Sequence, residues 1–266
     1  MKVLLLMLAA LHLTSVEFDT SGTFVVMTIS QNRAIIAADS RVTIGPEVTK
    51  DDQCKIAAIK DKFVIATAGR TGHGSPLPGF SWDSITVARN VIADLKLPLN
   101  INQVAIQWAE QVTALTNRDA QRDVIAAENI NNSDILSALL VGADGRSFSA
   151  FRIRIRKINA AAMNYTYTVE RLDPREWKIY PLGRIDIASE FVLQQSQRSQ
   201  AWMQTFHSEH PGASWDAVMP SLGQLLVNLT ATYSSARQFV GGATDVIEIT
   251  GMGSNWLQRK ENCPKD

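Results

Sequence analysis

The sequence predicts an α+β fold, a four-layer αββα sandwich in which two antiparallel sheets stack face to face and helices cover both outer faces. Runs rich in β-branched residues come in adjacent pairs, and they alternate along the chain with segments of helical apolar spacing. Because each sheet has two faces to bury, helices outside and a second sheet inside satisfy both. At 266 residues the chain is also long enough for one well-buried domain.

The first β-rich segments form two pairs near the N-terminus. Residues 23–30 and 33–39 are separated by a short polar step, and residues 55–59 and 62–68 repeat this arrangement. Each pair predicts a hairpin. A loop that contains Gly and Pro follows as far as Gly79, which indicates a change of structure.

Two helices are expected after that loop, because apolar residues then recur at helical spacing and a capping residue precedes the second group. The first helix would carry Ile85, Ala88, Val91, Ile92 and Leu95, and the second, capped by Asn102, would carry Val104, Trp108, Val112 and Leu115 on one face.

The C-terminal half returns to strands and then to helices. Strand composition covers residues 135–141, 148–155, 165–172 and 177–182, with a tight hairpin signal at Asp144-Gly145 between the first two. Helical patterns follow at residues 187–197 and in a segment that Ser214 can cap and Pro220 can bend, and residues 244–250 form the last expected strand.

The first 22 residues are expected to be a signal peptide or propeptide, residues 23–250 the folded domain and residues 251–266 a surface tail. Lys2 supplies positive charge and the apolar run from Val3 to Leu13 is too short to span a membrane, which is typical of an export signal. A buried first strand or helix is the alternative interpretation. Export predicts a secreted or periplasmic protein, whereas a leader that is only a propeptide predicts a cytoplasmic one.

The expected cut lies between Gly22 and Thr23. Thr20 and Gly22 are small and occupy the two positions that a signal peptidase inspects for this cut. Autocatalytic removal of a short propeptide, residues 16–22, is the other route. Either route would make Thr23 the first residue of the mature chain.

Composition excludes some classes of function. Lys plus Arg and Asp plus Glu each number 26, and no basic run occurs, so no nucleic-acid partner is expected. His207 and His210 lack a third ligand, so no metal or other cofactor is expected. Cys54 and Cys263 are the only cysteines, and either a disulfide or a structural free thiol at Cys54 fits the sequence.

Three residues with complementary chemistry lie at equal intervals in the N-terminal part. Thr23, Asp39 and Lys55 are each separated by 16 residues. If the chain is cut before Thr23, that residue carries both a hydroxyl nucleophile and a free α-amine, while the other two supply a carboxylate and an ammonium. These groups suffice for hydrolysis by an N-terminal nucleophile.

In this pattern the sequence resembles the proteasome β-type subunits of the N-terminal nucleophile hydrolase superfamily. Gly22-Thr23, Ala37-Ala38-Asp39-Ser40-Arg41, Lys55 and Ala68-Gly69 all match that family in one gap-free register. The resemblance implies that Thr23 is the nucleophile and that its α-amine accepts the proton. It further implies that Lys55 stabilises the developing alkoxide, that Asp39 holds Lys55 charged, and that the Gly69 N–H binds the oxyanion.

The same register implies a substrate pocket for the side chain that precedes the scissile bond. Its lining would be the neutral residues Val42, Gln53, Ala57, Thr67 and Thr71. Because no charged group is present to pair with a charged substrate, a neutral and apolar side chain is the expected preference. Packing between sheet and helix is the other interpretation of these residues.

The chain departs from the family pattern at two later places. Gly183-Arg184-Ile185-Asp186 stands where the family has Gly-Ser-Gly-Ser, and Arg237 and Val240 replace an Asp and a Ser that precede Gly241-Gly242. In the family these groups support the nucleophile, so the site is expected to be slower, differently specific or silent.

Three functions therefore remain open at the level of sequence. The first is an exported threonine peptidase of the proteasome type, and the second is a related enzyme that cleaves a small amide. The third is a non-catalytic assembly subunit whose leader is never cut. The resemblance implies a homo-oligomer, with a ring as one form, and an exported enzyme would lack the ATP that an unfoldase partner requires.

Overall fold

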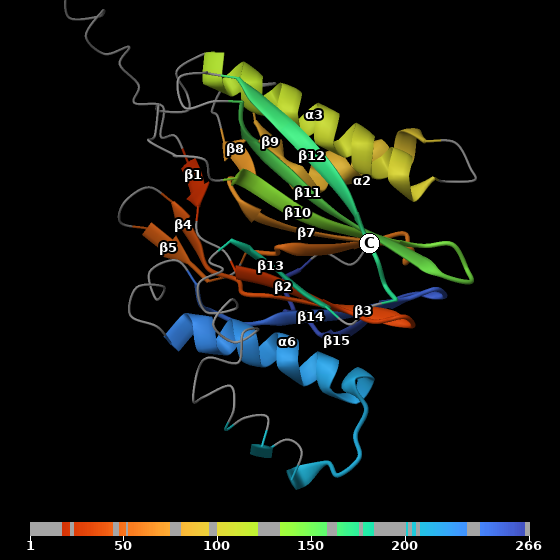
Figure 1. Ribbon diagram of the computed structural model, residues 1–266. Helices are drawn as coiled ribbons and strands as arrows, with labels where there is room; N and C mark the ends of the chain where they lie inside the picture. The colour runs from red at the N-terminus through yellow and green to blue at the C-terminus, as the bar shows by residue number, and fades with distance from the viewer. Residues whose placement is uncertain are drawn as a thin grey trace, which may run out of the picture.

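The computed structural model describes residues 18–21, 24–44, 48–51, 53–74, 81–95, 100–121, 134–158, 164–175, 178–183, 201, 204–205, 208–232 and 240–263. Two large antiparallel sheets stack on each other, α2 and α3 cover the outer face of one, and α6 covers the outer face of the other (Figure 1). The chain therefore has the predicted α+β sandwich architecture.

The first large sheet has the strand order β12-β11-β10-β7-β6, and every neighbouring pair is antiparallel. Its strands are β6 (Ile56–Ile59), β7 (Phe63–Gly69), β10 (Asp134–Ala143), β11 (Phe148–Lys157) and β12 (Tyr165–Leu172). The helices on its outer face are α2 (Ser84–Asp94) and α3 (Ile101–Gln121).

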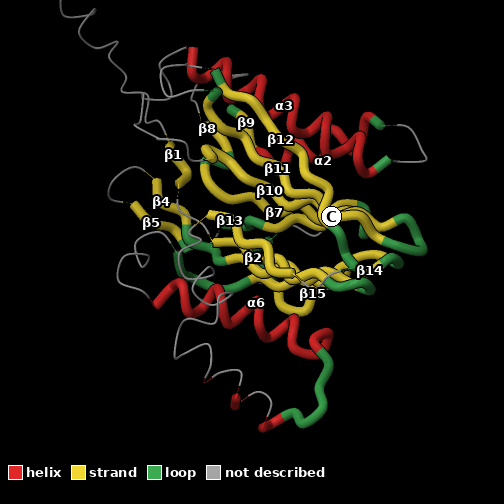
Figure 2. Tube along the Cα trace, in the orientation of Figure 1, coloured by secondary structure: helices red, strands yellow, loops and turns green. Residues whose placement is uncertain are grey.

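The second large sheet has the order β13-β2-β3-β14-β15 and is also antiparallel throughout. Its strands are β2 (Phe24–Ile29), β3 (Arg33–Ala38), β13 (Lys178–Gly183), β14 (Asp245–Thr250) and β15 (Gly253–Gln258). Helix α6 (Trp215–Thr232) packs against it (Figure 2). The two predicted N-terminal hairpins, β2–β3 and β6–β7, thus belong to different sheets.

A third, small sheet was not predicted. It has the order β5-β4-β1-β8-β9 and lies at one end of the sandwich (Figure 1). Its strands are β1 (Phe18–Ser21), β4 (Val42–Ile44), β5 (Val48–Lys50), β8 (Gly72–Gly74) and β9 (Trp82–Asp83). These strands have two to four residues, too few to show a period-two pattern.

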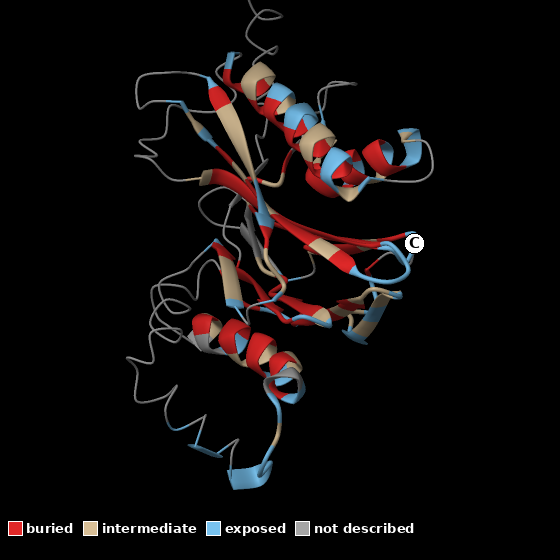
Figure 3. Cartoon of the chain, turned by 45° about the vertical axis from the view of Figure 1, so that its right-hand side comes forward, coloured by how far each residue is buried: buried red, intermediate tan, exposed pale blue. Residues whose placement is uncertain are grey.

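Three apolar layers separate the four layers of secondary structure. One lies between α2, α3 and the first sheet and includes Trp108, one lies between the sheets and includes Val25 and Leu139, and one lies between the second sheet and α6 and includes Leu222. Figure 3 shows the buried residues concentrated on the strands and on the inner faces of the helices. Among the described helices, none is long and apolar enough to cross a membrane.

The helix boundaries are close to those expected. The side chain of Asp83 caps α2 by accepting the N–H of Thr86. At α3 the cap is Asn100, whose side chain accepts the N–H groups of Asn102 and Gln103, so the predicted cap lies two residues too late. The helix expected at residues 187–197 falls outside the described residues.

Both ends of the domain differ from the expected boundaries. Residues 18–21, which were assigned to the leader, form strand β1 inside the small sheet. Beyond Thr250, where a surface tail was expected, β15 continues the second sheet by a hairpin with β14. A glycine permits this turn, because Gly253 has φ +141° and a Cβ there would lie 2.6 Å from the carbonyl oxygen of Asp61.

Candidate active site

Asp39 and Lys55 form a buried ion pair between the two large sheets. Asp39 follows the last residue of β3, Lys55 immediately precedes β6, and their side chains are 0% and 1% exposed. Lys55 Nζ donates to Asp39 Oδ1 at 2.8 Å and also to the backbone carbonyl of Arg41. The structure therefore brings together two of the predicted site residues.

The carboxylate of Asp39 is also held by three backbone N–H groups. Phe24 donates to Oδ1 at 2.9 Å, and Gly241 and Arg41 donate to Oδ2 at 3.0 and 3.2 Å. Each oxygen thus accepts two hydrogen bonds when Lys55 is included. This arrangement fixes the position and orientation of the carboxylate between the strands.

The Gly241-Gly242 step is part of this arrangement, although sequence reasoning assigned it no role and noted only the departures at Arg237 and Val240 before it. The carbonyl of Gly241 accepts the N–H groups of Ser40 and Arg41, each at 3.0 Å. Gly242 has φ +73°, and a Cβ there would lie 2.2 Å from Ser40 Oγ. The two adjacent glycines were the available signal, since they mark a backbone segment that must approach another closely.

Burial changes the titration of Lys55. Loss of solvation lowers the pKa of its ammonium to about 8, and the neighbouring Asp39 carboxylate opposes this shift without cancelling it. Lys55 therefore exchanges its proton near neutral pH, where an exposed lysine stays charged. The free α-amine of a chain start titrates in the same range, with an unperturbed pKa of about 7.7 to 8.0.

These two groups predict a narrow pH optimum for any activity of the processed chain. The rate should rise as the α-amine becomes neutral and fall as Lys55 loses its proton above about pH 8. In a Lys55→Arg variant the falling limb should disappear, since a guanidinium keeps its proton to above about pH 12. Measurement of kcat/KM from about pH 6 to about pH 10 tests this. Identical falling limbs in both proteins would contradict the assignment.

Gly69, the predicted oxyanion donor, ends β7 in a conformation that requires glycine. Its φ is +92°, and a Cβ at this position would lie 2.4 Å from the carbonyl oxygen of Ile135. That same oxygen accepts the N–H of Arg70 at 2.8 Å. Glycine therefore has a structural reason at this position in addition to the predicted role of its N–H.

The predicted pocket residues divide into two groups. Ala57 and Thr67 are buried beneath the helical layer, where Ser84 Oγ donates to Thr67 Oγ1 at 3.4 Å. Gln53 and Thr71 are half-buried, and Val42 lies in β4. Backbone contact places Thr67 beside Lys55, whose carbonyl accepts the Thr67 N–H at 3.2 Å. Their role as a substrate pocket stays a prediction.

Several predicted residues lie outside the described residues. They are Gly22, Thr23, Arg184, Ile185, Asp186, His207 and Arg237. The residues that the sequence analysis paired with His207 and Arg237 are described: His210 is exposed and Val240 is fully buried. Within the described part of the chain, no group of three or more His, Cys, Asp or Glu side chains is placed to hold a metal ion.

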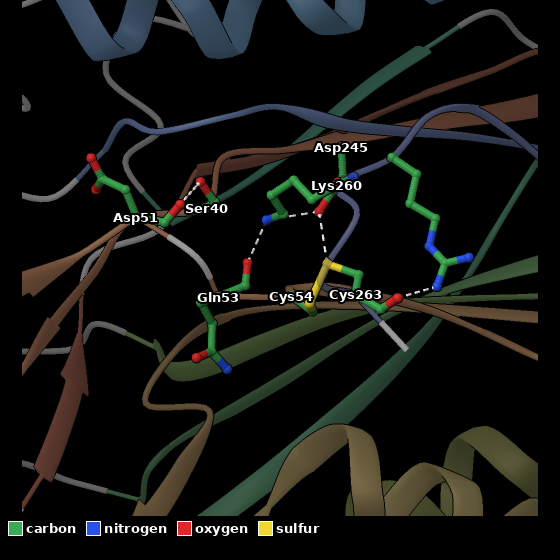
Figure 4. Close-up of a disulfide and its surroundings, with 8 residues drawn as sticks. Ser40, Asp51, Gln53, Cys54, Asp245, Lys260 and Cys263 are labelled. Carbon is green, nitrogen blue, oxygen red and sulfur yellow. Dashed lines mark hydrogen bonds and ion pairs between the residues drawn. A yellow bond between two sulfur atoms is a disulfide. The ribbon is translucent and has the colours of Figure 1, made fainter. Parts of the chain in front are cut away.

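A C-terminal cluster, which we define as Cys54, Asp245, Lys260 and Cys263, includes the residue that immediately precedes Lys55 (Figure 4). Cys54 and Cys263 form a disulfide with a Cα–Cα distance of 5.6 Å, which answers the question that the sequence left open. Lys260 Nζ lies 2.9 Å from Asp245 Oδ2 and donates to the Gln53 carbonyl at 2.6 Å. The cluster thereby ties the residues before Lys55 to the end of the chain.

Strand β1 lies between β4 and β8 in the small sheet. It pairs antiparallel with β4 through Thr20↔Ile44 and Ser21↔Thr43, and with β8 through Phe18↔Gly74 and Asp19↔His73. The segment that precedes the expected cut is therefore an inserted strand between two strands of the domain. Phe24, three residues after Ser21 in the sequence, donates its N–H to Asp39.

Comparisons with known proteins agree with this fold. The sequence profile of a family described as "Proteasome subunit" matches residues 19–77. A solved structure of similar fold is the Anbu (Gly-1) mutant from Hyphomicrobium sp. strain MC1, with a TM-score of 0.54 and 12% sequence identity over 91% of this chain and 89% of that chain. A search of curated protein sequences gave no match.

Fold and site together define an α+β sandwich with a buried acid–lysine pair between its two sheets. The matched segment contains both members of that pair as well as Gly69. The resemblance to the proteasome β-type subunits is thereby confirmed, and the chain has a proteasome-like fold.

Proposed function

We propose that this chain is an amide hydrolase that uses Thr23 as an N-terminal nucleophile after cleavage of the Gly22–Thr23 bond. The observation that carries the proposal is the set of contacts around Asp39. Its carboxylate binds both the Lys55 ammonium and the N–H of Phe24, the residue bonded directly to Thr23. The chain segment that begins at Thr23 is thus attached to the buried ion pair.

In the proposed reaction the Thr23 hydroxyl oxygen attacks the carbonyl carbon of the substrate amide and its proton passes to the α-amine. The positive charge of Lys55 lowers the cost of the developing alkoxide, and the Gly69 N–H stabilises the oxyanion. Collapse of the tetrahedral intermediate breaks the C–N bond, and the leaving amine takes the proton. Water then hydrolyses the ester and restores the Thr23 hydroxyl.

The position of β1 supports a peptide substrate. When cleavage before Thr23 releases β1, strands β4 and β8 lose the ladder partner that lay between them. An extended peptide can then add as a strand in the same place, because main-chain hydrogen bonds there do not depend on side chains. A small amide would leave most of this ladder unfilled.

We also propose that the bond before Thr23 is cut during export of the protein. The order of charge, apolar run and small residues before Thr23 supports processing by a signal peptidase, which would place the enzyme outside the cytoplasm. Self-assembly into a homo-oligomer, with no ATP-driven unfoldase, is the arrangement we propose for that setting.

Replacement of Thr23 by Ala tests the proposed function. Both proteins should be produced behind a cleavable tag that leaves residue 23 first, so that processing is not a variable. Wild-type protein should cleave neutral peptide amides, and Thr23→Ala should lose about 10³-fold or more in kcat. Thr23→Ser, which keeps a hydroxyl, should retain measurable activity. Equal rates for wild type and Thr23→Ala would remove the mechanism.

A non-catalytic assembly subunit is the second candidate, and one observation favours it. The leader strand β1 is hydrogen-bonded on both edges, which is the arrangement expected of a segment that is kept. The intact mass of protein from its native source separates the two candidates. A mature chain that starts at Thr23 supports the hydrolase, and any other start leaves Thr23 without a free α-amine.

A further inference from the structure

A cavity of about 470 Å³ adjoins Gly69 between the two large sheets. Its lining comes from the end of β7, from β10 and β11 of the first sheet, and from β13 of the second. Its described lining includes Gly69, Asp134, Ser137, Arg152, Arg154 and Arg156. The cavity therefore contains three arginines from a single strand.

The arginines occupy one face of β11, and the alternation of the strand explains why. Ile153 and Ile155 point to the layer that packs against the helices, so Arg152, Arg154 and Arg156 share the opposite face, toward the second sheet. In register, Arg154 lies opposite Ser137, which lies opposite Ala68 next to Gly69. Residues directly opposite in a ladder share a face, so Arg154, Ser137 and Ala68 lie on one wall, and Gly69 follows Ala68 in the chain.

Only one of these arginines has an acidic partner among the described residues. Arg152 donates to Glu170 at 2.9 and 2.6 Å and lies 5.8 Å from the ring centre of Tyr180. Arg154 and Arg156 form no hydrogen bond or ion pair through their side chains within the described part of the chain. Asp134, which accepts from Ser137 at 3.2 Å, offsets part of their charge, and the described lining of the cavity is positive.

The described lining of the cavity and the partners of the leader come from different strands. The leader strand β1, which precedes the expected cut, pairs with β4 and β8. The described lining residues of the cavity belong to other strands, namely β7, β10, β11 and β13. A substrate whose acyl part follows the path of β1 and whose carbonyl lies at the Gly69 N–H would therefore extend its leaving part into the cavity.

We propose that this cavity is a carboxylate-binding subsite that selects amides whose leaving part carries a negative charge, with Arg154 and Arg156 as specificity-determining residues. Guanidinium groups bind carboxylates through paired hydrogen bonds, and the half-buried position of Arg154 strengthens its attraction relative to open water. The carboxylate can come from an acidic side chain or from the C-terminus of a short peptide. The inference rests on the proposed hydrolase function.

A substrate series tests the selection. Three peptides would share a neutral acyl part and differ after the scissile bond, which is followed by glycine amide, by glycine with a free carboxylate, or by aspartate amide. Wild-type protein should cleave one or both charged peptides with a kcat/KM about 10- to 100-fold higher than the neutral one. The two charged peptides distinguish a terminal from a side-chain carboxylate. The preference should weaken with added salt.

The double variant Arg154→Gln/Arg156→Gln should lose this preference, so that its kcat/KM for the charged peptides falls to its own value for the neutral peptide. Arg154→Lys/Arg156→Lys keeps the charge without the paired geometry and should be intermediate. A matched control, Arg146→Gln/Arg171→Gln, removes the same charge from two exposed positions and should keep the preference. An active wild type without preference, or a preference that survives in the Arg154/Arg156 double variant, would overturn the proposal.

Binding gives a second readout that needs no turnover. Isothermal titration of wild type and the double variant would use a short neutral peptide with a free C-terminal carboxylate, its C-terminal amide, and an aspartate-containing amide. Tighter binding of a charged peptide that Arg154→Gln/Arg156→Gln abolishes supports the subsite even where no hydrolysis occurs. Equal affinities for all three overturn it, whereas failure of the proposed function alone appears as carboxylate binding without Thr23-dependent cleavage.

Discussion

Replacement of Asp39 by Asn should lower kcat/KM by about 10³-fold and destabilise the fold by about 3 to 5 kcal/mol. The reason is the donor set around this side chain. Phe24 N–H and Lys55 Nζ donate to one oxygen, and Arg41 and Gly241 N–H donate to the other. An asparagine offers one acceptor oxygen and one NH2 group, so in either orientation the NH2 faces two donors.

The loss of charge acts on Lys55 as well. Its pKa is already lowered by burial, and the Asp39 carboxylate is the main group that opposes this. Without it the ammonium is an uncompensated buried charge, which is costly, or it loses its proton and no longer stabilises an alkoxide. Stability and activity should therefore fall together, as measured by urea unfolding and by steady-state kinetics at about pH 7.

Lys55→Met is the informative comparison for this prediction. It should reduce activity as strongly, but the loss of stability should be smaller, because Asp39 keeps three backbone donors and Met fills much of the space left by the lysine stem. If Lys55→Met were as destabilising as Asp39→Asn, the carboxylate would depend on the ammonium and the backbone donors would contribute little.

The parts of this structure with a local pattern were predictable from sequence. The strand composition of β2, β3, β10 and β11, the helical spacing in α2 and α3, and the register of Asp39 and Lys55 each depend on residues close together in the chain. The αββα arrangement follows from these elements because each sheet has two apolar faces, and both must be buried. Gly69 was predictable as a special position, since glycine at a strand end indicates unusual backbone geometry.

The parts that sequence did not predict are long-range contacts. Gly241 donates to Asp39 across 202 residues, and no local period connects the two. Strand β1 was not predicted as a strand, because it and its partners β4 and β8 are too short to be recognised from sequence. The arginines of β11 were visible as a charged alternation with Ile153 and Ile155, but the cavity they face exists only once β13 lies across from them.

Removal of the disulfide with Cys54→Ala/Cys263→Ala should have the second large effect, about 5 kcal/mol. The bridge closes a loop across 209 residues, and an unfolded chain gains more entropy from opening a longer loop. For a domain of this size that loss corresponds to a decrease in Tm of about 10 to 20 °C. Thermal unfolding of wild type with and without reductant should show the same decrease, while the double variant should be insensitive to reductant.

The effect on activity should separate two roles of the C-terminal cluster. Cys54 immediately precedes Lys55. Lys260, three residues before Cys263, donates to the Gln53 carbonyl, so the segment that the bridge anchors also contacts the residues before Lys55. If the bridge positions Lys55, the double variant should lose activity at temperatures where it is still folded, with a fall in kcat and little change in KM.

Lys260→Met, which keeps the disulfide but removes the bond to Gln53 and the ion pair with Asp245, provides the matched test. Full activity in both variants below their Tm would limit the cluster to a role in stability, because the ladder of β6 and β7 would then suffice to hold Lys55 against Asp39.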